Sequence, residues 1–173
     1  LENVCLPLEA FTDLPREARY LVAEMKLEQV GLKAFASYFP ADLSGGMKKR
    51  AAIARAMALD PAILFLDEPS AGLDPVTSAG LDRLILRLRD TQGVTVVMVT
   101  HELASIFAVA DRCIMLDKQA RSLIAEGDPA RLRDCPPNAT VRAFFNREPE
   151  TLSAPQHPAS PLCPNPVSPK ERL

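Results

Sequence analysis

Two short apolar segments lie in the middle of the chain. Residues 62–66 read Ala-Ile-Leu-Phe-Leu and residues 94–99 read Val-Thr-Val-Val-Met-Val, without the alternation that marks a half-exposed strand. Between them, apolar side chains recur at helical spacing, on Leu81, Leu84, Ile85 and Leu88. The pattern predicts one βαβ unit, whose two parallel strands we expect to be buried on both faces.

The flanking segments predict further helices and one strand pair. Residues 15–31 show helical spacing of apolar side chains, with a proline for the first turn and a glycine after the end. After the second strand we expect a helix over 102–110, paired strands over 113–117 and 123–126, a short helix starting at Asp128-Pro129, and a last helix over 140–146.

Residues 149–173 differ in composition from the rest. Seven of the 16 prolines lie between Pro149 and Pro169, and no Asp, Glu, Lys or Arg occurs from Thr151 to Pro169. Such a segment cannot hold a helix or a strand ladder, so we expect a disordered tail after a globular part of residues 1–148.

Charge and cysteine spacing exclude several classes of function. Twenty Lys and Arg against 22 Asp and Glu give a net charge of -2 over 173 residues, so binding of nucleic acid by bulk charge is not expected. The four cysteines stand far apart without a CxxC pair, which indicates neither a zinc site nor a disulfide framework. We therefore expect free thiols.

A Ser-Gly-Gly run precedes a helical pattern in the first third of the chain. Ser44, Gly45 and Gly46 are followed by three basic residues and an Ala-rich stretch that ends at Leu59. Glycines at a helix start leave backbone amides accessible at the positive end of the helix dipole, which favours an anion such as phosphate. By itself such a run is more often only a turn and an N-cap.

Polar groups follow both predicted parallel strands. Asp67 and Glu68 come at the end of the first strand, and His101 follows the second. The carboxyl ends of parallel strands form the edge of a sheet where ligands bind. Adjacent carboxylates there suit Mg²⁺ and the orientation of an attacking water, and a neutral imidazole can hydrogen-bond a phosphate or that water. Alternatively, the acids cap the next helix and the histidine only hydrogen-bonds within the structure.

Taken together, the motifs resemble those of ABC-transporter ATPase subunits. The resemblance rests on the order and spacing of LSGGM at 43–47, ILFLDEP at 63–69, SAGLD at 70–74 and VTHE at 99–102. These are similar to the signature motif, Walker B motif, D-loop and H-loop, and the resemblance covers about residues 1–148. It implies an α/β fold of the P-loop NTPase type, with a mostly parallel sheet flanked by helices. Residues 1–60 would hold part of the α-helical subdomain and the signature helix, and 61–148 the core from Walker B onward.

The same resemblance implies a role for each motif residue in binding or hydrolysing ATP. Asp67 would coordinate Mg²⁺, Glu68 would act as catalytic base or position the water, and His101 would contact the γ-phosphate. Ser44, Gly45 and Gly46 would contact the ATP held by the opposite subunit of a dimer. The D-loop would touch across the dimer interface, through Ser70, Gly72 and Asp74.

Within the family, the segments GLKAFASYFPADLSGGM and ADRCIMLD are similar to the ATPase subunits of Mla-type phospholipid transporters. Met47 replaces the glutamine that is usual after the two glycines. This likeness implies lipid transport, integral membrane permease subunits as partners, and a peripheral location on the cytoplasmic face of a bacterial inner membrane.

None of the seven glycines begins a GxxxxGK[ST] loop, the Walker A motif that cradles the phosphates of ATP. We therefore expect that the chain is an incomplete ATPase whose N-terminal half is missing, inactive and poorly stable by itself. Two alternatives stay open. One is a catalytically dead subunit that donates its signature loop to another subunit's ATP. The other is a soluble ABC-type ATPase of ribosome or chromosome function.

Overall fold

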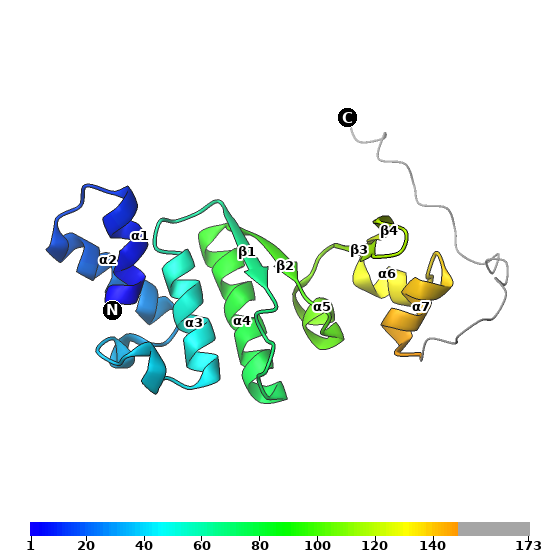
Figure 1. The fold of residues 1–173 in the computed structure, drawn as a ribbon, viewed down its shortest axis with the longest axis horizontal. Helices are drawn as coiled ribbons and strands as arrows, with labels where there is room; N and C mark the ends of the chain where they lie inside the picture. The colour runs from blue at the N-terminus through cyan, green and yellow to red at the C-terminus, as the bar shows by residue number, and fades with distance from the viewer. Residues whose placement is uncertain (149–173) are drawn as a thin grey trace. The chain divides into compact units, whose positions relative to one another are not determined.

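The computed structural model describes residues 1–148 of the chain, which fall into two compact units, Leu1–Val109 and the described part of Ala110–Leu173 (Figure 1). The expected disordered tail at 149–173 lies outside the described residues. The first unit contains α1 (Glu2–Phe11), α2 (Arg16–Gln29), the 3-10 helices η1 (Lys33–Phe35) and η2 (Pro40–Asp42), α3 (Gly45–Ala56), β1 (Ile63–Asp67), α4 (Pro75–Gln92), β2 (Thr95–Val99) and α5 (Leu103–Val109).

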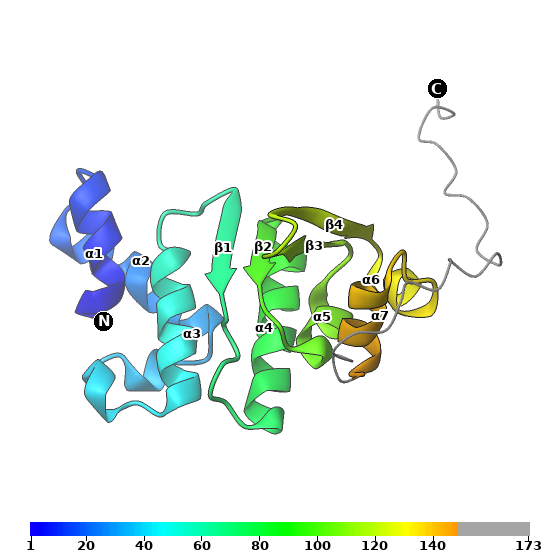
Figure 2. The ribbon, with the colours of Figure 1, turned by 45° about the vertical axis from the view of Figure 1, so that its right-hand side comes forward.

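The predicted βαβ unit is confirmed. Strands β1 and β2 pair in parallel, with Ile63 opposite Thr95 and Asp67 opposite Val99, and α4 makes the crossover between them. Figure 2 shows the two strands side by side, next to α4. The predicted stripe on α4 is its buried face, because Leu81, Leu84, Ile85 and Leu88 are each at most 4% exposed.

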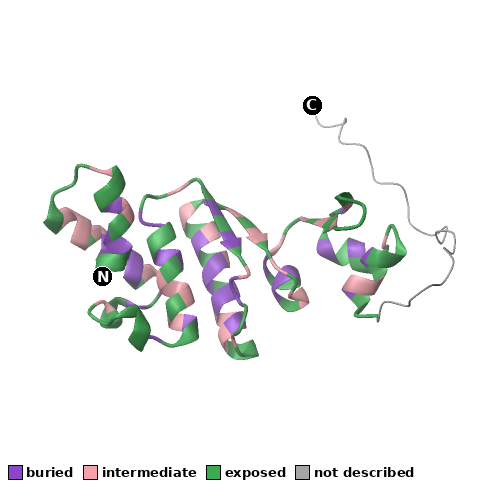
Figure 3. Ribbon diagram, viewed as in Figure 1, coloured by how far each residue is buried: buried purple, intermediate pink, exposed green. Residues whose placement is uncertain are grey.

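The expectation that both faces of these strands are buried is wrong for the described residues. On one face, Leu64 and Leu66 join the core with side chains of α3 and α4. On the other, Phe65 is 73% and Val99 is 61% exposed. The uniform apolar sequence therefore leaves one apolar face of the sheet uncovered within the first unit. Burial alternates along β1 and β2, and Figure 3 colours the residues of the chain by their burial.

The N-terminal part of the first unit is helical. Helix α1, which the sequence analysis did not predict, buries Val4, Cys5 and Leu8 against α2 and α3, although it contains Pro7. The predicted helix at 15–31 is confirmed as α2, with Pro15 at its N-cap. Lys26 of α2 is buried and pairs with Asp60, just before β1. This contact ties the helical part to the start of the sheet.

The second unit contains β3 (Cys113–Asp117), β4 (Ser122–Gly127), α6 (Pro129–Asp134) and α7 (Ala139–Asn146). The predicted strand pair is confirmed as an antiparallel hairpin, and Asp128 caps α6 by accepting from the Arg131 amide at 2.9 Å. Cys5 and Cys113 carry free thiols, as expected for these two residues. Within residues 1–148 no helix is both long and apolar enough to span a membrane.

Candidate functional site

The first unit contains every residue that the sequence analysis placed in the site. Asp67 is the last residue of β1, and Glu68 follows it with a backbone φ of 44°, in the left-handed region that non-glycine residues rarely adopt. The Glu68 amide donates to the Val99 carbonyl at 2.9 Å, which extends the pairing of the two strands. Lys49 of α3 donates to the Glu68 carbonyl at 3.0 Å. The backbone at Glu68 is thus held from two sides in a strained conformation, of the kind that clusters at functional sites.

Glu68 and His101 are in direct contact, as their positions after neighbouring parallel strands predict. The His101 Nδ1 atom lies 2.7 Å from Glu68 Oε1, and the Thr100 hydroxyl donates to Glu68 Oε2 at 3.4 Å. The hydrogen bond and the charge of Glu68 raise the pKa of His101 above its ordinary value. The imidazole is 80% exposed and the Glu68 side chain 33%, so this pair is accessible to solvent at the carboxyl edge of the sheet.

The Ser-Gly-Gly run forms the start of α3, as predicted. Ser44 is the N-cap, and its hydroxyl accepts from the Met47 amide at 3.3 Å. Gly46 is buried against α4, because a Cβ at this position would lie 2.5 Å from Thr77 Cγ2. A Cβ on Gly45 would meet Leu73 at an ordinary 3.6 Å. The structure therefore places these glycines beside the loop that precedes α4.

That loop contains the remaining predicted residues. Gly72 has a φ of 77°, which glycine adopts without strain. Asp74 caps α4 by accepting from the amides of Val76 and Thr77, each at 3.0 Å, and the hydroxyl and amide of Thr77 lower the pKa of its carboxyl. Ser70 is 3% exposed, and its hydroxyl has no hydrogen-bond partner within the described residues.

Carboxylate oxygens are the donors that Mg²⁺ prefers, and Mg²⁺ is usually held by one or two carboxylates together with substrate phosphates. Asp67 is exposed at the strand end and fits that donor set. Residues 1–148 contain no cluster of three or more His, Cys, Asp or Glu side chains arranged for a metal.

The sequence analysis missed three supporting residues. Lys49 is one of three consecutive basic residues, and the sequence does not tell which of them reaches the strand end. Thr77 lies in the first turn of α4 and Thr100 in the loop after β2, and neither residue type by itself marks a site. Only the position of Thr100, directly before the histidine, was a signal that could have identified it.

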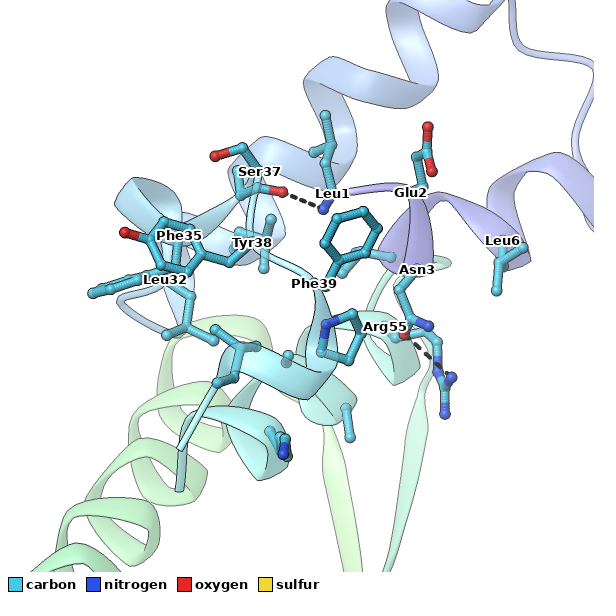
Figure 4. A pocket seen from close by; sticks show the side chains of 18 of the residues that line it. Leu1, Glu2, Asn3, Leu6, Leu32, Phe35, Ser37, Tyr38, Phe39 and Arg55 are labelled. Carbon is cyan, nitrogen blue, oxygen red and sulfur yellow. Dashed lines mark hydrogen bonds between the residues drawn. The ribbon is translucent and has the colours of Figure 1, made fainter. Parts of the chain in front are cut away.

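A pocket of about 850 Å³ lies apart from this edge, in the helical part of the first unit. Figure 4 shows Phe39 between Phe35 and Tyr38 on one side and Asn3 of α1 and Arg55 of α3 on the other, with Leu6 farther out; all of them line the pocket. Arg55 donates to the Asn3 side chain at 3.3 Å. The pocket therefore has an apolar lining that is interrupted by a few polar groups.

Comparisons with known proteins found a matching family model and similar sequences. The family model described as ABC transporter matches residues 5–71. The intermembrane phospholipid transport system ATP-binding protein MlaF of Escherichia coli (strain K12) is 40% identical over 146 residues, which are 84% of this chain and 53% of MlaF. The methionine import ATP-binding protein MetN of Brucella abortus (strain 2308) is 41% identical over 128 residues, 74% of this chain and 34% of MetN.

A solved structure supports the same assignment. It shows an ABC transporter described as of metal-chelate type in an inward-facing conformation, and it matches with a TM-score of 0.70 and 28% identity over 83% of this chain and 56% of that chain. The chain thus spans about half the length of the MlaF relatives. Motif order, sequence identity and fold agree, and the chain belongs to the ABC transporter family, among its ATP-binding subunits.

Proposed function

We propose that this chain supplies the hydrolytic edge of an ABC-type ATPase. The observation that carries the proposal is the direct contact between Glu68 and His101 at the carboxyl ends of two parallel strands. Both groups are ionisable and both face solvent beside Asp67. Hydrolysis of ATP needs a metal-binding carboxylate, a group that orients water and a group near the γ-phosphate, and this edge contains one candidate for each.

Each residue then has a separate task. Asp67 would hold Mg²⁺, which neutralises charge on the phosphates when it is bound. Glu68 orients the attacking water and accepts its proton, and the raised pKa of His101 lets the imidazole hold a proton toward the γ-phosphate. Lys49 and the Val99 carbonyl fix the backbone of Glu68, so that the carboxylate does not have to be ordered during the reaction.

The signature and D-loop residues would serve a neighbouring subunit. Ser44, Gly45 and Gly46 begin α3 beside the loop of Ser70, Gly72 and Asp74, so one surface would present both motifs. We assign this surface to a second ATPase subunit, in a homodimer where each signature loop faces the partner's ATP. In this arrangement residues 1–60 belong to the helical subdomain and 61–148 to the core.

The finer proposal is a phospholipid transporter, supported by the MlaF match, which covers more of this chain than the MetN match. The partners would be integral membrane permease subunits, which would hold the ATPase at the cytoplasmic face of a bacterial inner membrane. The pocket lined by Phe39 and Leu6 offers an apolar surface for an amphipathic permease helix, because these side chains are 74% and 52% exposed.

ATP hydrolysis by the native gene product, purified with the subunits that accompany it, tests the proposal. Glu68→Gln should lower kcat by about 10²- to 10⁴-fold while ATP binding persists, because the amide can still hydrogen-bond but cannot accept a proton. Glu24→Gln removes an exposed acid from α2 and is the matched control. Unchanged turnover in Glu68→Gln would refute the role of this residue. Turnover only after mixing with a homologue that carries a GxxxxGK[ST] loop would favour a subunit that donates its signature loop.

A further inference from the structure

Two hydrogen bonds between serines and carboxylates join α4 to α5. The Ser105 hydroxyl donates to Asp82 Oδ2 at 3.0 Å, and the Ser78 hydroxyl lies 3.5 Å from Glu102 Oε2. Ser78 and Asp82 are one helical turn apart on α4, while Glu102 directly precedes α5 and Ser105 lies in its first turn. Each side therefore contributes one serine and one acid, and we call these four residues the α4–α5 ladder.

The ladder connects the helices that follow two loops of the site. Helix α4 begins directly after Asp74, and α5 begins two residues after His101. The Glu102 amide donates to the Thr100 hydroxyl at 3.1 Å, and this hydroxyl contacts Glu68 at 3.4 Å. A continuous set of hydrogen bonds and covalent links thus runs from Asp82 to the Glu68–His101 pair.

Packing between α4 and α5 does not by itself explain an aspartate at position 82. Asp82 is 6% exposed, and its Oδ1 atom has no hydrogen-bond partner within the described residues. Ser105, its one partner there, is fully buried. A buried carboxylate with an unsatisfied oxygen lowers the stability of the fold. An apolar side chain could pack between the two helices without that loss.

Few neighbouring groups offset the cost of burying the Asp82 carboxylate. Among the elements packed against α4, α5 brings Glu102, whose negative charge acts unfavourably on the Asp82 carboxylate, and β2 contains no ionisable side chain. The Arg50 guanidinium of α3 lies against Gly80, where a Cβ would be 3.2 Å from Nη2. Burial and the charge of Glu102 together raise the pKa of Asp82, while the bond from Ser105 opposes this rise.

We infer that Asp82 is a positioning residue, which through Ser105 fixes the start of α5 so that His101 stays within hydrogen-bond distance of Glu68. One part of the inference, that the ladder affects the rate of ATP hydrolysis, rests on the proposed function. The arrangement of the Glu68–His101 pair itself does not depend on that function, and it can be measured separately.

The first test compares turnover in variants of the native gene product. Asp82→Leu and Ser105→Ala should each lower kcat for ATP hydrolysis by about ten- to a hundredfold and leave KM nearly unchanged, because misplacement of a catalytic group affects the chemical step. Asp82→Asn keeps an oxygen that accepts from Ser105 and should restore the rate. Asp90→Leu, at an exposed acid of the same helix, is the control.

The second test reads the position of His101 without ATP. The chain has two histidines, so NMR can follow the His101 imidazole with His157 as an internal reference. Since Glu68 raises the pKa of His101, that pKa should fall toward its ordinary value in Asp82→Leu and Ser105→Ala and be retained in Asp82→Asn. A wild-type pKa in all three variants would overturn the inference, even if the protein hydrolysed no ATP.

The two tests also separate the inference from the proposed function. A wild-type protein without ATPase activity would refute the proposed function, while the His101 titration would still decide the positioning role. An active wild type with undiminished kcat in Asp82→Leu would overturn the inference alone. Loss of activity and of melting temperature in all Asp82 variants, with no rescue by asparagine, would assign Asp82 a structural role only and would also overturn it.

Discussion

At the scale of single residues, Gly46 has a packing reason to be a glycine that is separate from any contact with phosphate. A Cβ would lie 2.5 Å from Thr77 Cγ2, which is closer than real Cβ contacts allow. Thr77 cannot rotate freely to relieve the clash, because its hydroxyl is hydrogen-bonded to Asp74. The second glycine of the signature motif therefore sets how closely the start of α3 approaches α4.

We predict that Gly46→Ala destabilises the protein by about 1–3 kcal/mol, the range typical of overpacked sites. Gly45→Ala is the control, because its Cβ would make an ordinary contact at 3.6 Å, and the gain in helix propensity should leave stability equal or slightly higher. Urea unfolding of both variants measures the difference. Equal midpoints for Gly46→Ala and the wild type would show that α3 and α4 are not packed so closely.

The sequence predicted the location of the candidate groups better than their environment. That Asp67, Glu68 and His101 lie at one edge of the sheet follows from their positions at strand ends, since parallel strands bring their carboxyl ends to one edge. The left-handed backbone at Glu68 could not be predicted, because no residue type marks it. It depends on the Val99 carbonyl and on Lys49, which come from distant parts of the sequence.

At the scale of elements, strongly periodic segments were predicted well and α1 was missed. The stripe on α4 specifies a helix by itself, and Asp74 and Gly93 mark its two ends. Helix α1 contains Pro7 and has no side-chain cap, so local signals argue against it. Its helical form depends on the burial of three side chains by α2 and α3, which a single segment does not reveal.

The contact between α4 and α5 makes stability depend on pH through Asp82. Because its pKa is raised in the folded state, the folded protein binds this proton more tightly than the unfolded chain. The stability from this proton is fully present below the ordinary aspartate pKa of about 3.9 and is lost as pH rises through the raised value.

We therefore expect Asp82→Asn to gain melting temperature relative to the wild type as pH rises from about 4. A gain of about 1 kcal/mol corresponds to about 2–4 °C for a chain of this size. Calorimetric scans at several pH values measure this difference. Asp90→Asn, at an exposed carboxylate of α4, should show no such trend. If the difference in melting temperature between Asp82→Asn and the wild type were the same at all pH values, the raised pKa of Asp82 would be contradicted.

At the scale of the whole molecule, apolar surface remains on the first unit. Ile63, Phe65, Val97 and Val99 form one face of the β1–β2 sheet, and each is at least 42% exposed. Exposed contiguous apolar surface of this kind marks interaction sites or a tendency to aggregate. The uniform strand sequences predicted burial on both faces, and no residue of the first unit covers this one.

The pocket of the helical part is a second apolar surface, and its proposed partner can be tested directly. Phe39 lines the pocket and is 74% exposed, while Phe11 is 76% exposed at the end of α1 and does not line it. The two side chains are thus matched in type and exposure, and they differ in location.

If the apolar face of an amphipathic permease helix fills the pocket, Phe39→Asp should reduce the permease that co-purifies with this chain by about tenfold or more, because a buried charge without a partner costs several kcal/mol. Phe11→Asp should leave co-purification unchanged. Melting temperatures of the two variants should be equal, since neither side chain belongs to the core. Equal loss of the permease in both variants would show that general surface polarity, and not the pocket, governs assembly.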